Sequence, residues 1–106
     1  SASGPLQRVV TALGNVGPQA IQAGPEGSVY LSDSRTHSVY RLAQDGSLSL
    51  IAGNGRAGYG GDDGPADLAA LNQPEGLALS PDGSLFVADS LNFRIRRIAS
   101  DGTITT

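Results

Sequence analysis

Short apolar runs recur along the chain, and each is closed by glycine, proline, aspartate or serine. Runs bounded in this way by turn residues are typical of β-strands. Strict alternation is blurred at Arg96 and Arg97, which stand together between Ile95 and Ile98, as expected where a sheet is packed on both faces. The predicted strands are residues 18–23, 28–33, 37–43 and 47–52, followed by 74–79, 84–89, 93–99 and 102–106. The pattern predicts an all-β fold.

The second half of the chain repeats the first. Residues 18–50 align with residues 74–106 without a gap, at a constant offset of 56 residues (74 − 18). Identical positions are mostly turn residues, and conservative pairs such as Val39 and Ile95 fill the strands. Each copy is therefore predicted to form four antiparallel strands. Four-stranded antiparallel units in series are typical of the blades of a β-propeller.

Turn chemistry recurs at matching points of the two copies. Proline and glycine stand where tight reversals need them, and the Asp-Gly pairs supply the positive φ that hairpin turns require. Aspartates at the end of the second strand of each copy are expected to accept backbone N–H groups and so to hold the turn, which favours a structural role over a glycosidase pair. The predicted structural turn residues are Asp33, Asp89, Gly27, Gly83, Asp45, Gly46, Asp101 and Gly102.

Residues 73–106 resemble the NHL repeat, whose hallmark is an Asp-x-x-Asn-x-Arg-Ile segment; residues 89–95 here read Asp-Ser-Leu-Asn-Phe-Arg-Ile. Residues 17–50 resemble the same repeat more loosely. The glycine-rich stretch 53–72 is similar to the connector of bacterial NHL proteins and of the teneurin propeller. The resemblance implies a β-propeller, commonly of six blades.

The repeat divides the chain into four parts. Residues 1–17 are interpreted as a tail with the outer strand of a preceding blade, 18–52 as the first blade, 53–73 as a glycine-rich connector with a short helical turn, and 74–106 as the second blade. The helical turn is predicted from Ala66 to Leu71, where the three-residue spacing of Leu68 and Leu71 predicts one apolar face. Two blades cannot close a ring, and each blade buries its faces on neighbours. We therefore expect a homo-oligomer, first a trimer with a six-bladed ring and next a tetramer with an eight-bladed one, or an excised part of a longer propeller.

Composition narrows the function classes. The 106 residues include 15 Gly and no Cys, and all seven basic residues are Arg. These absences exclude disulfides, zinc–thiolate sites, thiol nucleophiles and a Schiff-base lysine, and they fit a reducing or an oxidising compartment equally well. Some NHL propellers bind RNA, but the net charge of −3 argues against a nucleic-acid partner despite the cluster Arg94, Arg96 and Arg97. No run approaches the roughly 20 apolar residues of a membrane span, so no membrane partner is expected.

Three further patterns suggest chemistry, each with a simpler structural interpretation. The Gly-x-Gly-x-x-Gly motif at 53–58 lacks the helix that a dinucleotide site needs. Ser34, His37 and Asp33 share one tight turn, unlike the members of a catalytic triad. Asp62, Asp63 and Asp67 offer calcium ligands without the spacing of an EF-hand loop. We expect no catalytic residue, metal site or cofactor; the alternative is a fragment of a metal-dependent propeller hydrolase or lyase.

A partner-binding face is predicted where the connectors after the second and fourth strands open together. Tyr59 and Phe93 have the chemistry of aromatic anchors, although the alternative is that both pack the connector onto its own blade. The residues predicted for this loop face, which would take a protein partner, are Arg35, His37, Tyr59, Asn92 and Phe93. The sequence thus favours a non-catalytic scaffold or binding module, with a fragment of a larger cell-surface recognition protein as an alternative.

Overall fold

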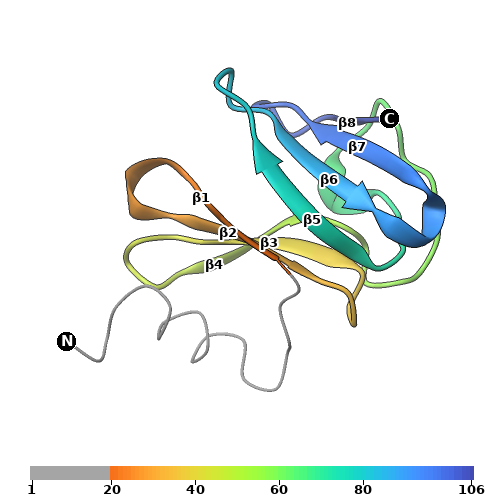
Figure 1. Cartoon of the computed structure of the whole chain (residues 1–106), viewed down its shortest axis with the longest axis horizontal. Helices are drawn as coiled ribbons and strands as arrows, with labels where there is room; N and C mark the ends of the chain where they lie inside the picture. Colours follow the sequence, from red (N-terminus) through yellow and green to blue (C-terminus); the bar gives the residue numbers. More distant parts are fainter. Residues whose placement is uncertain (1–19) are drawn as a thin grey trace.

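The structure, a computed structural model, describes residues 20–106. Its strands form two four-stranded antiparallel sheets in the order β1-β2-β3-β4 and β5-β6-β7-β8 (Figure 1). The first sheet holds β1 (Ala20–Ala23), β2 (Val29–Asp33), β3 (Ser38–Leu42) and β4 (Leu48–Ala52). The second holds β5 (Pro74–Leu79), β6 (Leu85–Asp89), β7 (Arg94–Ile98) and β8 (Ile104–Thr105). Three 3₁₀ turns are η1 (Pro25–Gly27), η2 (Ala66–Leu68) and η3 (Ser90–Asn92).

The predicted all-β fold with two four-stranded antiparallel units is confirmed. The boundaries of the eight predicted strands differ from the observed ones by at most two residues. The proposed outer strand within residues 1–17 lies outside the described residues. No helix in the described part is long and apolar enough to cross a membrane.

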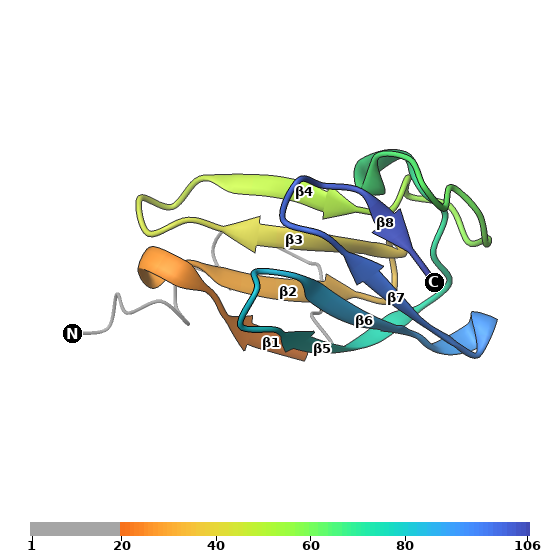
Figure 2. The same cartoon turned by 90° about the horizontal axis from the view of Figure 1, so that it is seen from above.

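The two sheets pack against each other through one hydrophobic core, and they overlap when seen from above (Figure 2). They diverge toward the β1–β2 and β5–β6 turns (Figure 1). The core collects buried side chains from both sheets and from the connector between them: Val39, Ala52, Ala66, Ala69, Leu71, Leu85, Val87, Ile98 and Ile104. A cross-sheet hydrogen bond from Ser32 Oγ to the Glu75 carbonyl, 2.9 Å long, adds to this interface. The sheets are therefore stacked like successive blades of a propeller.

Turn residues at matching positions of the repeat adopt matching conformations. Asp45 Oδ1 accepts the N–H of Ser47 at 2.9 Å, and Asp101 Oδ1 accepts the N–H of Thr103 at 2.9 Å. Both turns place the glycine after the aspartate at positive φ, which a residue without Cβ adopts at little cost. The φ angles at the predicted turn glycines are 75° at Gly27, 94° at Gly46, 89° at Gly83 and 91° at Gly102.

The helical turn expected from Ala66 to Leu71 is shorter than the sequence suggested. Helical structure ends with η2 at Leu68, because the next residues pair with the first half of the connector: Ala70 forms a bridge with Gly60, and Leu71 forms one with Ala57. Leu71 is fully buried while Leu68 is 71% exposed. The two leucines do not share an apolar face, so that expectation was wrong.

Candidate functional site

A buried arginine fastens the connector to the second sheet. Arg96 lies on β7 with none of its surface exposed. Its Nη1 donates to the carbonyl of Ala70 at 3.0 Å and to Asp89 Oδ2 at 3.2 Å, while its Nη2 donates to the carbonyl of Gly60 at 3.0 Å and to Asp62 Oδ1 at 2.9 Å. Charge-assisted bonds of this kind are about twice as strong as neutral ones. One guanidinium thus holds both halves of the connector against the blade.

Tyr59 completes this arrangement from the connector side. Its ring centroid lies 4.8 Å from the guanidinium carbon of Arg94 and 4.8 Å from that of Arg96, distances at which cations are attracted to the ring. Its hydroxyl donates to Asp62 Oδ2 at 3.3 Å and lies 2.9 Å from the Thr106 hydroxyl. Tyr59 is 46% exposed, but these contacts pack the connector onto its own blade.

The two repeat-related aspartates differ in their partners. Asp33 Oδ1 accepts the N–H of Arg35 at 2.8 Å, which is the turn-holding bond expected for this position. Asp89 instead accepts the N–H of Asn72 at 2.7 Å, from the connector, and forms an ion pair with Arg96. Asp33 therefore holds its own turn, whereas Asp89 anchors the connector.

The turns of the predicted loop face are tied into the same region. His37 Nδ1 accepts the N–H of Gln73 at 3.1 Å, which links the β2–β3 turn to the end of the connector. Asn92 Nδ2 donates to the carbonyl of Gly58 at 2.8 Å and to Asp89 Oδ2 at 2.8 Å. His37, Asn92 and Tyr59 all make internal contacts, so they position the loops.

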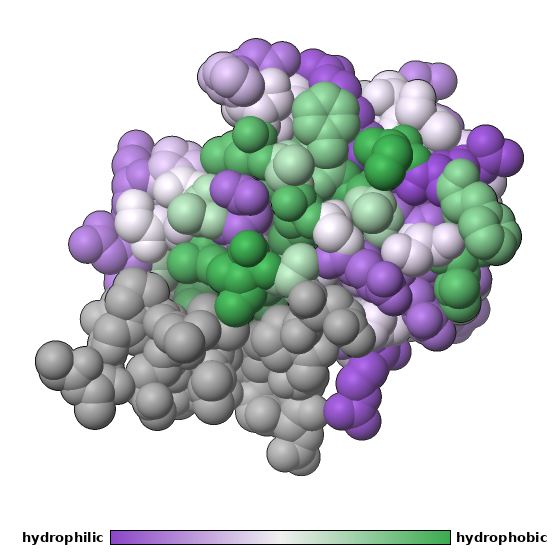
Figure 3. All heavy atoms as spheres, viewed as in Figure 1, coloured by the Kyte–Doolittle hydropathy of each residue, from purple (hydrophilic) through white to green (hydrophobic). Residues whose placement is uncertain are grey.

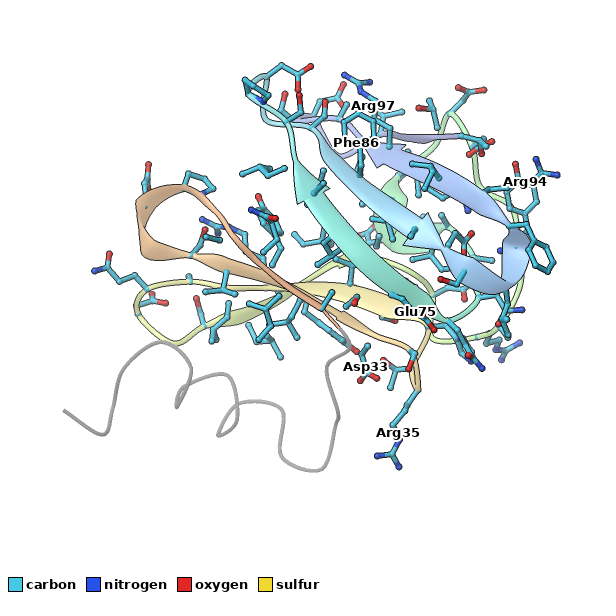
Figure 4. The ribbon with its side chains drawn as sticks, viewed as in Figure 1. Asp33, Arg35, Glu75, Phe86, Arg94 and Arg97 are labelled. Atoms are coloured by element: carbon cyan, nitrogen blue, oxygen red, sulfur yellow. The ribbon has the colours of Figure 1, made fainter. Side chains whose placement is uncertain are left out.

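Phe93 is the exception on this face. It is 90% exposed and follows η3 in the left-handed conformation, with φ of 56°. Leu91, in η3 itself, is 49% exposed. Arg35 is also exposed, at the β2–β3 turn, and its side chain extends away from the sheet (Figure 4). The exposed apolar surface of the predicted loop face is therefore concentrated at the β6–β7 turn.

The basic cluster of β7 is dispersed by the fold. Arg96 is buried, Arg94 stands over the Tyr59 ring, and Arg97 pairs with Asp82 at 3.3 Å. Figure 4 shows Arg94 and Arg97 at opposite ends of the strand. The three guanidinium groups do not form one positive face of the kind that binds a phosphate backbone.

Three aspartates remain ionised to low pH for identifiable reasons. The N–H and hydroxyl of Ser84 lower the pKa of Asp82 to about 2. The Thr106 hydroxyl, with a smaller effect from Arg96, lowers the pKa of Asp62, and the N–H of Thr103 lowers the pKa of Asp101. Each carboxylate is stabilised by donors in its own neighbourhood.

The residues suggested for metal binding or catalysis are not assembled into one site. Asp62 is held by Arg96 and Thr106. Among residues 20–106, no three His, Asp or Glu side chains lie close enough together to hold one metal ion. His37 and Asp33 each bind a backbone N–H, which does not match the ordered bonds of a catalytic triad.

Arg96 is the important residue that sequence reasoning did not single out. Its position in the strand alternation was a usable signal, because β7 pairs it with Val87 and places it on the same face as buried Ile98. An arginine at a core-facing strand position needs carboxylates or carbonyls around it. Asp89 lies on the neighbouring strand β6, but Asp62 and both carbonyls belong to the connector, which the alternation alone does not reveal.

The two stacked sheets and the connector that crosses between them define a pair of consecutive β-propeller blades of the NHL type. The chain belongs to the teneurin NHL domain family, whose model matches residues 6–100. The NHL resemblance inferred from the sequence is confirmed.

Relatives with longer chains share this region. Mouse Teneurin-3 is 36% identical over 95 residues, which cover 77% of this chain and 4% of that protein. The Arabidopsis thaliana protein SUPPRESSOR OF QUENCHING 1, chloroplastic, is 38% identical over 82 residues, which cover 76% of this chain and 8% of that protein. The chain thus spans only a small part of the length of the curated relatives it matches.

Solved structures show the same architecture. A protein of unknown function from Bacteroides thetaiotaomicron superposes with a TM-score of 0.72 at 27% identity, covering 88% of this chain and 24% of that chain. Virginiamycin B lyase from Staphylococcus aureus superposes with a TM-score of 0.62 at 18% identity, covering 85% of this chain and 26% of that one. The likeness to the lyase concerns the fold alone.

Proposed function

We propose that the chain is a non-catalytic binding module whose two blades are completed into a closed propeller ring by other copies of the chain. The second sheet would carry its outer face against the first sheet of the next copy, in the head-to-tail manner that generates rings. With two sheets in each chain, three copies supply six blades and four copies supply eight.

A comparison of repeat-related positions carries this proposal. Val39 on β3 faces the second sheet and is fully buried. Its counterpart in the second repeat is Ile95 on β7. Ile95 lies on the face of the second sheet that points away from the first sheet, and it is 57% exposed. This repeat position is apolar in both copies but covered only in the first, which supports a further blade on the exposed face of the second sheet.

The internal bonds of the loops support a non-catalytic role. His37, Asp89 and Asp62 are each engaged in holding the connector or a turn, so their side chains serve the architecture. Phe93 and Leu91 stand outside this network and would contact a protein partner on the loop face. Exposed aromatic residues of this kind dominate many protein interfaces.

The mass of the particle in solution tests the proposal. Light scattering coupled to gel filtration should give three times the mass of one chain, or four times for the larger ring. The substitution Ile95→Glu should shift the mass toward that of one chain, because it places a charge in the proposed interface.

Leu68→Glu is the matched control, because Leu68 is even more exposed but lies in η2 on the connector and not on a strand of either sheet. This control should leave the mass unchanged. A folded, stable single chain in the unsubstituted protein contradicts self-assembly, as does an oligomer that Ile95→Glu and Leu68→Glu affect equally.

A further inference from the structure

A groove of about 670 Å³ opens between the two sheets where they diverge. It lies at the end of the molecule that carries the β1–β2, β5–β6 and β7–β8 turns (Figure 1). On the side of the molecule formed by β1 and β5, hydrophobic side chains also gather where the sheets separate (Figure 3). The volume of the groove is in the usual range for ligand sites. The large apolar and aromatic side chains that line it are Tyr30, Leu50, Ile51, Leu85 and Ile98.

Carboxylates border this apolar groove on several sides. Asp63 and Asp67 come from the connector, and Asp101 comes from the β7–β8 turn. All three are exposed. The lining includes no arginine; Arg41, which is paired with Tyr30 across β2 and β3, is not among the lining residues. The groove therefore combines apolar walls with negative charge at its margin.

The spacing of these acids indicates what they can bind. Two of the carboxylates are carried by the connector and the third by the β7–β8 turn, and the described residues contain no cluster of acids or histidine able to hold a single metal ion. The N–H of Thr103 lowers the pKa of Asp101 below its ordinary value, so this carboxylate is charged at neutral pH. Separate charges along an apolar groove complement a ligand that carries several cations at intervals.

We propose that this groove binds an extended peptide segment in which arginine or lysine alternates with apolar side chains. The apolar side chains of the peptide lie against Leu50, Ile51 and Tyr30, and its cationic groups reach the three aspartates. Long cationic side chains suit this position, because their stems cover apolar surface while their charges stay at the margin. All of the lining residues belong to one chain, so the site exists whether or not the chain assembles into a ring.

Fluorescence anisotropy with the full chain tests this site. The probe is a fluorescein-labelled peptide of sequence Leu-Arg-Leu-Arg-Leu, and the comparison peptides replace both arginines by serine or by glutamate. We expect the arginine peptide to bind most tightly, and its affinity to fall as salt is raised. Equal binding of the serine or glutamate peptide would overturn the proposal.

The repeat offers a matched pair of variants. Asp101→Asn and Asp45→Asn alter the same turn position in the two blades, but only Asp101 lines the groove. Asp101→Asn should weaken peptide binding about threefold, the size of an exposed ion pair, whereas Asp45→Asn should leave binding unchanged. Equal effects of the two substitutions would refute the site. If Asp101→Asn does not fold, Asp63→Asn and Asp67→Asn give the same test on connector residues.

Discussion

Replacing Arg96 with methionine should destabilise the chain more than any other single arginine substitution on β7. The change removes four hydrogen bonds and both ion pairs, and it leaves the carboxylate of Asp89 fully buried without its cation. Breaking a buried ion pair from one side typically costs 3–5 kcal/mol, because one charge is left uncompensated. Domains of this size are stable by only about 5–15 kcal/mol. We therefore expect the melting temperature to fall by more than about 10 °C.

Urea denaturation followed by circular dichroism measures this loss at one fixed protein concentration. Hydrogen exchange should show in addition that the connector amides of residues 57–71 lose protection first. Arg94→Met is the control, because Arg94 makes the same 4.8 Å contact with the Tyr59 ring from an exposed position, where such contacts contribute about 0.5–1 kcal/mol.

The conservative change Arg96→Lys separates charge from geometry. Lysine keeps the positive charge but cannot hold four acceptors in one plane, so its effect should lie between those of Arg96→Met and Arg94→Met. Equal stability of the Arg96→Met and Arg94→Met variants would show that the buried ion pairs do not hold the connector, and the reasoning would be wrong.

Three more outcomes follow from local geometry. Asp82 has a folded-state pKa of about 2 against an ordinary 3.8, so its contribution to stability is present above pH 4 and lost as pH falls toward 2. The melting temperature of Asp82→Asn should therefore change less with pH across that window than that of the unsubstituted protein. Gly53→Ala should destabilise by about 2–3 kcal/mol in urea titrations, because φ there is 97° and the new Cβ would overlap the carbonyl of His37, whereas Gly55→Ala, with open space around it, should cost about 1 kcal/mol. Phe93→Gly should leave stability unchanged or raise it slightly, because the side chain is 90% exposed and φ is 56°; a clear fall in melting temperature would show that Phe93 is packed in the folded protein.

Much of the fold could be predicted from the sequence because strands and turns are specified by residues close together in the chain. Apolar runs and turn residues lie within a few positions of one another, and the observed turn glycines indeed adopt positive φ. The repeat then extended each local assignment to a second copy 56 residues away. The helical turn at Ala66–Leu71 was overestimated for the opposite reason: Ala70 and Leu71 pair with connector residues rather than with their own neighbours.

For the candidate site too, the sequence predicted the local features but not the contacts between distant segments. The sequence drew attention to the connector and to the turns that meet it. It placed His37 and Asn92 among the contact residues, and it left open whether Tyr59 contacts a partner or packs the connector onto its own blade. In the fold their polar atoms are already engaged within the chain. Phe93 keeps its exposure, because its left-handed conformation ends η3 and directs the chain back into β7.

The amino-acid sequence by itself determined the strands, their turns and their grouping into two NHL blades, since strand period and turn propensity are properties of neighbouring residues. Tertiary structure alone decided that Arg96 is buried, because three of its four acceptors come from segments 26 to 36 residues away in the chain. It also decided where the acidic groove lies, since two sheets and a connector must meet to form its walls. Burial and charge balance depend on which distant segments come together, and that is settled only when the blades pack.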